Sequence, residues 1–386
     1  MYPWRRSGHH WLVFTGGNHM LSKCALACGI AGLCGALLFV AQPLTLSASP
    51  SIEAATAGAA NSCDRACLQG FVDQYLDALA ADDPSRLPVT QDVKFTEDGQ
   101  RLSLGDGLWN TATGRGTYKF YMEDPDAGEA AFFGTMRESG EPIVLALRLK
   151  IENRKIAEAE TIVVRDVQEA QSMEKRGHTD PLFMEPSPAA ERVSRADLVR
   201  TANLYFSGMQ LDDGRGNYSF FANDCDRVEN GSEATNNPVN RNGGLVASQG
   251  NSVDKNSSER SDLTYSASWS CKEQFQSGLL HFVTRIRDRR FVMVDPERGV
   301  ALAFTFFDHA SGKTRVFKLP NGRTVTSGPT TPWTWEIAEV FKVERGKIRR
   351  IEAVYHRAPY GMNSGWSTWR DSMSTLARWA AIPGQN

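Results

Sequence analysis

Apolar side chains recur at helical spacing in the segment from Cys63 to Ala81. The positions concerned are Leu68, Phe71, Val72, Tyr75, Leu76 and Leu79. A repeat of about 3.6 residues predicts one helix, and the Asp82-Asp83-Pro84 run predicts its end. The acid-rich, glycine-punctuated stretch from there to Trp109 is expected to be irregular. Strands are predicted where apolar runs lie between turn residues, over 117–122, 130–136, 143–151 and 156–164.

The second half of the chain repeats this order of elements. Ser194 followed by Asp197 is the pattern of a helix N-terminus, and the helix that it begins would present Leu198, Ala202, Tyr205 and Phe206. Strands are expected after an intervening loop, over 278–284, 291–294, 300–307, 314–319, 333–343 and 348–357. Each half is therefore predicted to be a helix, an irregular crossover and an antiparallel meander, which is an α+β arrangement.

The two halves also match in sequence where they end. Residues 144–165 align with residues 336–357, and both segments contain an apolar strand, a hairpin ending in Lys-Ile and a second strand that closes with Arg. Self-similarity of this kind predicts a duplicated domain.

Several segments resemble the SnoaL-like branch of the nuclear transport factor 2-like superfamily, and in particular its secreted tandem members of largely uncharacterised function. The resemblance covers about 62–165 and 193–370, and is carried by FVDQYLDAL, GDGLWNTATG, FFANDCDRVENG, IRDRRFVMVDPERG, FDH and HRAPYGMNSGW. It implies two tandem cone-shaped domains, each a long helix packed on a curved antiparallel sheet, and an intramolecular pseudo-dimer of the two. Because the superfamily includes isomerases, dehydratases, lyases and non-catalytic binding proteins, the resemblance does not select an activity.

The N-terminal 49 residues are expected to be a signal peptide, with Met20 as an alternative start. Residues 24–41 carry no charge, follow Lys23 and run into small residues. An uncleaved anchor is the alternative, since 18 apolar residues can just span a bilayer. The protein is accordingly expected to be secreted or periplasmic, without membrane attachment after the signal is removed.

The remaining chain is expected to divide into a first SnoaL-like domain over 62–165, a proline-containing linker over 166–192 and a second SnoaL-like domain over 193–386. An Asn-, Ser- and Gly-rich insertion over 231–262 is expected to be a mobile surface segment. Four cysteines lie outside the targeting segment, and an even number in an oxidising compartment predicts two disulfides. Cys225–Cys271 is favoured, which leaves Cys63–Cys67 and requires Cys63 to sit at or before the first helical turn.

Composition and missing motifs exclude several functions. The chain of 386 residues is 41% hydrophobic and carries a net charge of −2, so it has no basic surface of the kind that binds nucleic acid. It contains no GxGxxG after a strand, no GxxxxGK[ST], no GxSxG and no HExxH. No cofactor is expected. The cysteines lack zinc-site spacing, so no metal is expected either, although His281, His309 and His356 together are kept as an alternative set of ligands.

The candidate catalytic residues lie in two segments of the second half. The first contains Asp224, Arg227 and Glu229, of which a partly buried carboxylate could act as a general base; the alternative is a turn whose side chains cap backbone amides. The second contains Tyr355 and His356, which alternate on a strand, so only one of them can point into the cone. His356 is the histidine whose ordinary pKa suits proton transfer.

The aromatic residues indicate a flat, apolar ligand. The candidate substrate-binding residues are Tyr205, Trp335, Tyr360, Asn363 and Trp366 in the second half and Trp109 and Tyr118 in the first. The leading hypothesis is a cofactor-independent lyase, dehydratase or isomerase that acts on a hydroxylated aromatic or cyclic small molecule by acid–base catalysis. A non-catalytic small-molecule-binding protein is the main alternative, and a structural or secreted interaction protein is a third. The first domain is expected to be a supporting copy.

Overall fold

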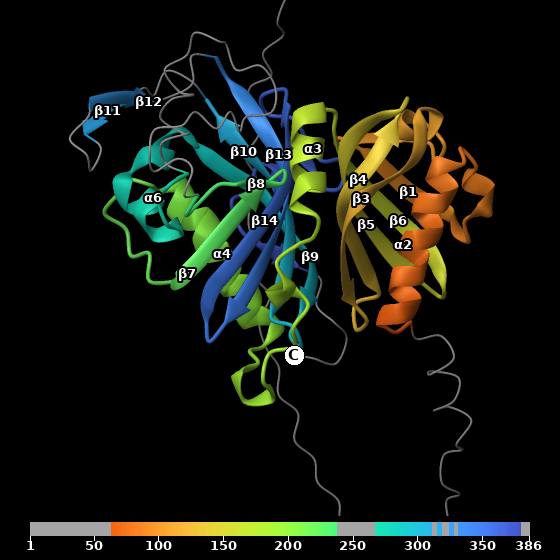
Figure 1. The fold of residues 1–386 in the computed structure, drawn as a ribbon, viewed down its shortest axis with the longest axis horizontal. Helices are drawn as coiled ribbons and strands as arrows, with labels where there is room; N and C mark the ends of the chain where they lie inside the picture. Colours follow the sequence, from red (N-terminus) through yellow and green to blue (C-terminus); the bar gives the residue numbers. More distant parts are fainter. Residues whose placement is uncertain (1–62, 238–266, 311–314, 319–323, 328–330, 380–386) are drawn as a thin grey trace, which may run out of the picture. The chain divides into compact units, whose positions relative to one another are not determined.

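The computed structural model describes residues 63–237, 267–310, 315–318, 324–327 and 331–379. Within these ranges the chain forms helices and two large β-sheets, so the α+β class is confirmed (Figure 1). The expected signal peptide, and residues 238–262 of the expected insertion, lie outside the described residues. In the described part, no helix is both long and apolar enough to cross a membrane.

The first sheet has six strands in the order β2-β1-β6-β5-β4-β3. Its strands are β1 (Val89–Glu97), β2 (Gln100–Leu102), β3 (Ala112–Asp124), β4 (Glu129–Glu138), β5 (Glu141–Glu152) and β6 (Lys155–Val164). Helix α2 (Arg65–Ala80) precedes them, and its N-cap Asp64 accepts a hydrogen bond from the Cys67 backbone N–H. Two short 3₁₀ helices, η1 (Pro84–Arg86) and η2 (Gly107–Asn110), connect the elements.

The second sheet has seven strands in the order β15-β9-β10-β13-β14-β7-β8. Its strands are β7 (Phe221–Glu229), β8 (Ser232–Glu233), β9 (Arg285–Asp295), β10 (Val300–His309), β13 (Trp333–Glu344), β14 (Lys347–Ala358) and β15 (Arg378–Trp379). A separate hairpin pairs β11 (Arg315–Lys318) with β12 (Thr324–Ser327). Helix α4 (Arg195–Gln210) begins at Ser194, as the sequence predicts, and α6 (Cys271–Ser277), η6 (Leu279–Phe282) and α7 (Trp369–Ser372) complete this half.

Both sheets are mixed, which corrects the expected purely antiparallel meanders. β1 pairs in parallel with β6, and β7 pairs in parallel with β14. β1 lies in the acid-rich, glycine-punctuated stretch that was expected to be irregular, and β7 lies where a loop was expected; in the structure both are flanking strands whose polar side chains are partly exposed. The expected strand over 278–284 is also wrong, because Leu279–Phe282 form η6.

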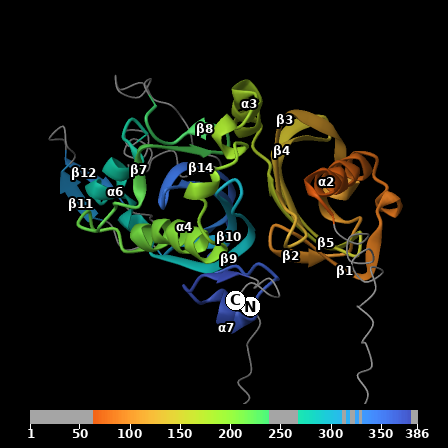
Figure 2. The ribbon, with the colours of Figure 1, turned by 90° about the horizontal axis from the view of Figure 1, so that it is seen from below.

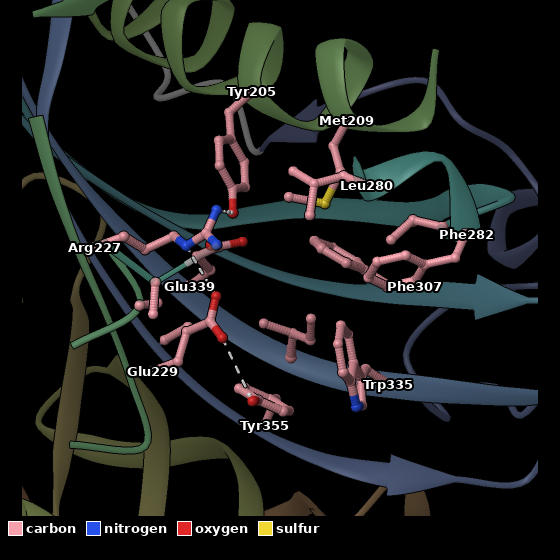
Figure 3. A pocket seen from close by; sticks show the side chains of 15 residues that line it. Tyr205, Met209, Arg227, Glu229, Leu280, Phe282, Phe307, Trp335, Glu339 and Tyr355 are labelled. Carbon is pink, nitrogen blue, oxygen red and sulfur yellow. Dashed lines mark hydrogen bonds and ion pairs between the residues drawn. The ribbon is translucent and has the colours of Figure 1, made fainter. Parts of the chain in front are cut away.

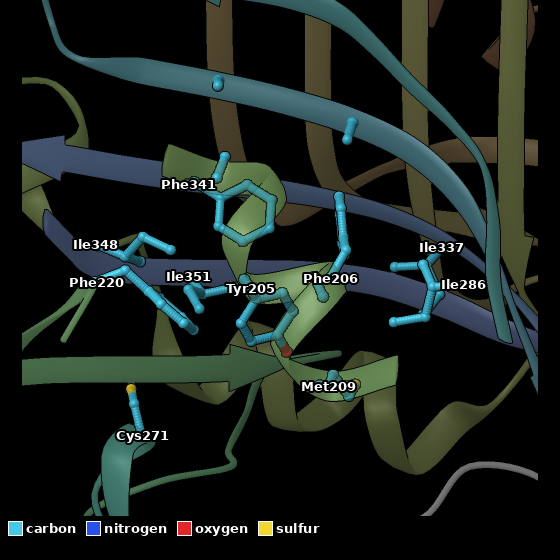
Figure 4. Packing of buried hydrophobic residues seen from close by; sticks show 14 of the residues in the cluster. Tyr205, Phe206, Met209, Phe220, Cys271, Ile286, Ile337, Phe341, Ile348 and Ile351 are labelled. Carbon is cyan, nitrogen blue, oxygen red and sulfur yellow. The ribbon is translucent and has the colours of Figure 1, made fainter. Parts of the chain in front are cut away.

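Each sheet curves around one helix (Figure 2). Leu68, Val72 and Leu76 of α2 pack on the first sheet in one apolar cluster. Tyr205 and Phe206 of α4 pack on the second sheet in another, against Phe341 and neighbouring side chains (Figure 4). The burial of these apolar faces holds each helix on its sheet.

A third apolar cluster joins the faces of the two sheets that point away from these helices. It contains Phe120 and Phe133 from the first sheet, Leu302 and Phe304 from the second, and side chains of the linker helix α3 (Val167–Arg176). The linker further contains η3 (Pro181–Phe183) and η4 (Ala189–Glu191). The two sheets therefore share a buried interface, and the linker is packed on it.

Buried polar contacts cross the same interface. The Tyr118 hydroxyl donates to Glu352 Oε1 at 2.6 Å, and Arg290 forms a two-pronged ion pair with Glu160 at 2.5 and 3.0 Å. Since such groups are costly to bury unpaired, these contacts specify how the two sheets meet.

Both expected disulfides are present. Cys225–Cys271 joins β7 to the start of α6, with a Cα–Cα distance of 5.9 Å. Cys63–Cys67 has a Cα–Cα distance of 5.2 Å, and Cys63 lies before the N-cap of α2, outside the regular helix, as this pairing requires.

Candidate functional site

A cavity of about 50 Å³ lies inside the second sheet, between α4 and the strands (Figure 3). It is lined by Tyr205, Met209, Arg227, Glu229, Ala234, Ala267, Leu280, Phe282, Val283, Phe307, Trp335, Ile337, Glu339, Ala353 and Tyr355. In Figure 3 the ionisable side chains gather at one end and the apolar side chains at the other. The cavity therefore offers a polar head and an apolar body to a ligand.

Arg227 organises the polar end from strand β7. Its Nε lies 2.9 Å from Glu229 Oε1, its Nη1 donates to the Tyr205 hydroxyl at 3.2 Å and its Nη2 donates to Gln274 Oε1 at 2.8 Å. Arg227 is 5% exposed. A buried guanidinium held from three sides is pre-oriented, so it can stabilise a negative charge in the cavity without rearranging.

Glu339 of β13 is a further ionisable group at this end, and it was not among the residues selected from the sequence. Its side chain is 2% exposed. Its pKa is raised from 4.5 to about 8: burial is the main cause, Arg227 opposes the rise, Glu229 adds to it, and a hydrogen bond from Tyr205 opposes it. Among the described residues, none donates a hydrogen bond to Glu339 Oε2. The carboxyl group is thus poised to exchange a proton near neutral pH with a group in the cavity.

Two tyrosines supply hydroxyl groups beside these charges. Tyr205 extends into the cavity from α4. Tyr355 extends into it from β14, and its hydroxyl lies 3.5 Å from Glu229 Oε2 (Figure 3). Burial raises the pKa of both tyrosines well above 10. Both hydroxyls therefore keep their protons at neutral pH and can serve as hydrogen-bond donors.

The apolar end is formed by η6 and the ends of β10 and β13. Leu280, Phe282, Phe307 and Trp335 face the cavity there. His309 lies beside them, with its ring stacked on Trp333 at 3.6 Å between centroids, and burial lowers its pKa to about 3. His309 is thus a neutral packing residue, and it is not brought together with His281 and His356 as a set of metal ligands.

The structure brings five of the expected site residues to this cavity, namely Arg227, Glu229, Tyr355, Tyr205 and Trp335. Asp224 is not among them. Its side chain is 54% exposed and forms an ion pair with Arg349, which lowers the pKa of Asp224. The candidate base of the polar end is therefore Glu229 or Glu339, because alternation along β7 turns Asp224 away from the cavity.

His356 is also placed elsewhere. It lies on the opposite face of β14 from Tyr355, and its Nε2 is 3.1 Å from Glu336 Oε2. The expectation that His356 shares a pocket with Arg227 is thus corrected: the strand alternation that places Tyr355 in the cavity turns the next side chain toward the first sheet.

The other expected ligand-binding residues lie outside the cavity. Tyr360 is 45% exposed, Asn363 accepts a hydrogen bond from the Ser372 hydroxyl, and the Trp366 indole N–H donates to Thr96 Oγ1 at 2.8 Å. In the first half, Trp109 is buried beside Tyr75 in the helix-side core, whereas Tyr118 lies in the interface between the sheets.

One signal in the sequence points to Glu339. Ile337 and Phe341 lie two positions before and after it on β13, hence on the same face of the strand, and both belong to the core around α4. A glutamate at an inward-facing position of an apolar strand is costly without a function or a partner. The alternation therefore indicates that the Glu339 side chain points to the same side of the strand as this core.

The fold and the cavity define the class of this protein as an α+β protein of two sheets, with a buried arginine–carboxylate site in the second. Residues 191–355, which run from the end of η4 to Tyr355 of β14, match a family model described as Domain of unknown function (DUF8021). No curated protein matches the chain.

Proposed function

We propose that the cavity of the second sheet converts a small hydroxyl- or carbonyl-bearing molecule by general acid–base catalysis, as a lyase, dehydratase or isomerase. The observation that carries this proposal is the buried Glu339 carboxyl group, whose Oε2 lies in the cavity wall without a hydrogen-bond partner among the described residues. Inward-facing Arg227 supplies the positive charge that such chemistry requires.

The roles follow from the charges. Glu339 is protonated below its pKa of about 8, so it can give a proton to a leaving hydroxyl or to a developing alkoxide. Glu229 would accept the proton from carbon, and the Arg227 guanidinium would stabilise the resulting oxyanion. In a dehydration, the C–H electron pair forms the new C=C bond, and the hydroxyl leaves as water with the proton from Glu339.

The size of the cavity limits the substrate. An engineered apolar cavity that binds benzene has a volume of about 150 Å³, whereas this one measures about 50 Å³. A ligand of a few non-hydrogen atoms fits directly. A hydroxylated aromatic or cyclic ligand, the class that the aromatic composition suggests, would require lining side chains such as Met209 and Leu280 to move.

The wider setting is part of the same proposal. The helix and curved sheet of each half, together with the sequence resemblance, support two tandem SnoaL-like domains that form a pseudo-dimer with the active copy in the second half. The two disulfides support an exported protein, secreted or periplasmic. No cofactor is needed for the proposed steps.

A non-catalytic binding protein is the second candidate. It is favoured by the saturation of Arg227, whose three donor groups already contact Glu229, Tyr205 and Gln274. Such a closed network can hold a ligand dipole without taking part in proton transfer.

The experiment is to incubate the full chain with pools of small hydroxylated and carbonyl compounds and to follow loss of water, bond cleavage or isomerisation by mass spectrometry and chromatography. Glu339→Gln and Arg227→Met should lower turnover by roughly 10²–10⁴-fold. Asp224→Asn, an acid-to-amide change outside the cavity, is the control and should keep full activity. If a compound binds but is recovered unchanged, the protein is a non-catalytic binding protein. If Asp224→Asn abolishes turnover while Glu339→Gln does not, the catalytic site lies elsewhere than in this cavity.

A further inference from the structure

A second cluster of ionisable groups lies across β13 and β14 from the cavity. Glu336 and His356 are direct cross-strand partners in the antiparallel pairing of β13 with β14. Because Glu339 and Tyr355 face the cavity, Glu336 and His356 face the first sheet. Asp98, in the tight turn between β1 and β2 of that sheet, meets them there.

The three side chains converge on one point. His356 Nε2 lies 3.1 Å from Glu336 Oε2 and 3.6 Å from Asp98 Oδ1. The three potential ligand atoms all lie within 4.8 Å of one another. Ligands at about 2.0–2.2 Å from a tetrahedral zinc ion are separated by roughly 3.3–3.6 Å, so only small side-chain movements are needed to bind the ion.

Residues outside the cluster orient Asp98 by hydrogen bonds and charge, as is usual for metal ligands. Asp98 Oδ1 accepts a hydrogen bond from the Val163 backbone N–H at 2.8 Å, and Arg165 lies 3.4 Å from Asp98 Oδ2. Such second contacts orient a carboxylate and leave further oxygen lone pairs for a cation.

The turn that presents Asp98 is tightly packed. The next residue, Gly99, has a φ of +70°, and a Cβ atom there would lie 2.7 Å from the Asn363 carbonyl oxygen and 2.9 Å from Met362 Cε. The segment after β14 therefore clamps the β1–β2 turn, and the position of Asp98 relative to Glu336 and His356 is built into the fold.

The cluster is also accessible. The Glu336 side chain is 4% exposed, but those of Asp98 and His356 are 22% and 15% exposed. A cation can thus reach the nitrogen and the carboxylate oxygens from the open side, and a water molecule can complete its coordination.

We propose that Asp98, Glu336 and His356 form a binding site for one divalent transition-metal ion, with Zn²⁺ as the best fit. One imidazole nitrogen and two carboxylate oxygens are ligands that zinc accepts, and two negative charges neutralise the ion. This site is separate from the cavity and does not depend on the proposed function. The bound ion would tie the β1–β2 turn of the first sheet to β13 and β14 of the second.

The direct test is to strip the full chain with a chelator and to titrate it with Zn²⁺ and with Co²⁺ as a spectroscopic probe. One equivalent should bind, with the visible absorption of low-symmetry Co²⁺, and Zn²⁺ should raise the melting temperature. His356→Gln should lower the affinity at least about 100-fold, because changes to second contacts alone cost 10–100-fold. His178→Gln, a histidine of the linker, is the matched control and should bind like the wild type.

Two further measurements keep the test decisive if a variant fails to fold. Asp98→Asn changes a ligand in a turn instead of in a central strand, and it should also weaken binding. X-ray absorption of the zinc-loaded wild type should show nitrogen and oxygen neighbours at about 2.0–2.2 Å. Affinity no tighter than millimolar, sulfur neighbours, or equal binding by the His356→Gln and His178→Gln proteins would overturn the proposal.

Discussion

Tyr355 and His356 are consecutive residues of β14, and their side chains lie on opposite faces of the second sheet. The Tyr355 hydroxyl is 3.5 Å from Glu229 inside the cavity, whereas His356 Nε2 is 3.1 Å from Glu336 on the face toward the first sheet. One strand pair thus contributes to two separate polar sites. Variants of these two neighbours should therefore have unrelated effects.

The buried Glu339 carboxyl should make stability depend on pH. Its pKa is 4.5 when unfolded and about 8 when folded, so the folded state keeps a proton that the unfolded state releases between these values. The wild type should lose stability relative to Glu339→Gln as pH rises from about 5 to 8, by up to about 1.4 kcal/mol per pH unit. Denaturant unfolding of both proteins at several pH values measures this.

The groups that face Glu339 are Arg227, Glu229 and Tyr205, and all three are unchanged in the glutamine variant. Other titrating groups are common to both proteins, so the difference between them isolates Glu339. A difference that is constant from pH 5 to 8 would show that Glu339 is ionised throughout.

The two disulfides should differ in their contributions to stability. Cys225–Cys271 closes a loop of 46 residues and Cys63–Cys67 closes one of 4. In the chain-entropy model, Cys225→Ser/Cys271→Ser should lower the free energy of unfolding by about 4 kcal/mol and Cys63→Ser/Cys67→Ser by about 2 kcal/mol. Chemical denaturation of both variants gives the comparison, and equal losses would contradict the loop-length argument.

The buried ion pair between the sheets should show strong coupling. Glu160 is 2% exposed and lies between Arg290 and Arg148, at 2.5 and 3.7 Å. Glu160→Gln leaves two buried guanidinium groups close together and should cost about 3–5 kcal/mol. The Glu160→Gln/Arg290→Met protein should be more stable than the sum of the single losses implies, by on the order of 2 kcal/mol.

A double-mutant cycle in urea measures this coupling. Additive losses would mean that Glu160 and Arg290 act independently, and that the apolar cluster alone holds the sheets together.

A side chain at Gly231 should destabilise the protein. It has a φ of +79° in the turn between β7 and β8, and a Cβ atom there would lie 2.5 Å from Met173 Cα of α3. Gly231→Ala should therefore add an overpacking cost of about 1–3 kcal/mol to the strain of the left-handed backbone. Gly140→Ala is matched in backbone sign, at a φ of +89°, but has open space, so it should cost only about 1–2 kcal/mol. Thermal unfolding compares the stability of the two variants. Equal losses of stability would show that α3 moves to make room for the Cβ atom.

Most of the local secondary structure could be predicted from the sequence. The helical period from Leu68 to Leu79 predicted α2, Ser194 predicted the start of α4, and turn residues placed most strands within a few residues. The favoured Cys225–Cys271 pairing is confirmed, and so is the remaining Cys63–Cys67 pair, which required Cys63 to lie at or before the first helical turn. Strand alternation correctly separated Tyr355 from His356.

What the sequence could not supply was the pairing of distant segments. The polar strands β1 and β7 become strands because β6 and β14 offer them a parallel edge, a contact with no local signature. For the same reason, only some residues of the candidate site could be identified from the sequence. Arg227 and Glu229 were evident as a charged cluster, but Glu339 joins them from a strand more than a hundred residues away. Asp98, Glu336 and His356 meet only because two sheets pack face to face. Hydrophobic periodicity and helix capping depend on residues a few positions apart. The composition of a site depends on which distant segments tertiary packing brings together.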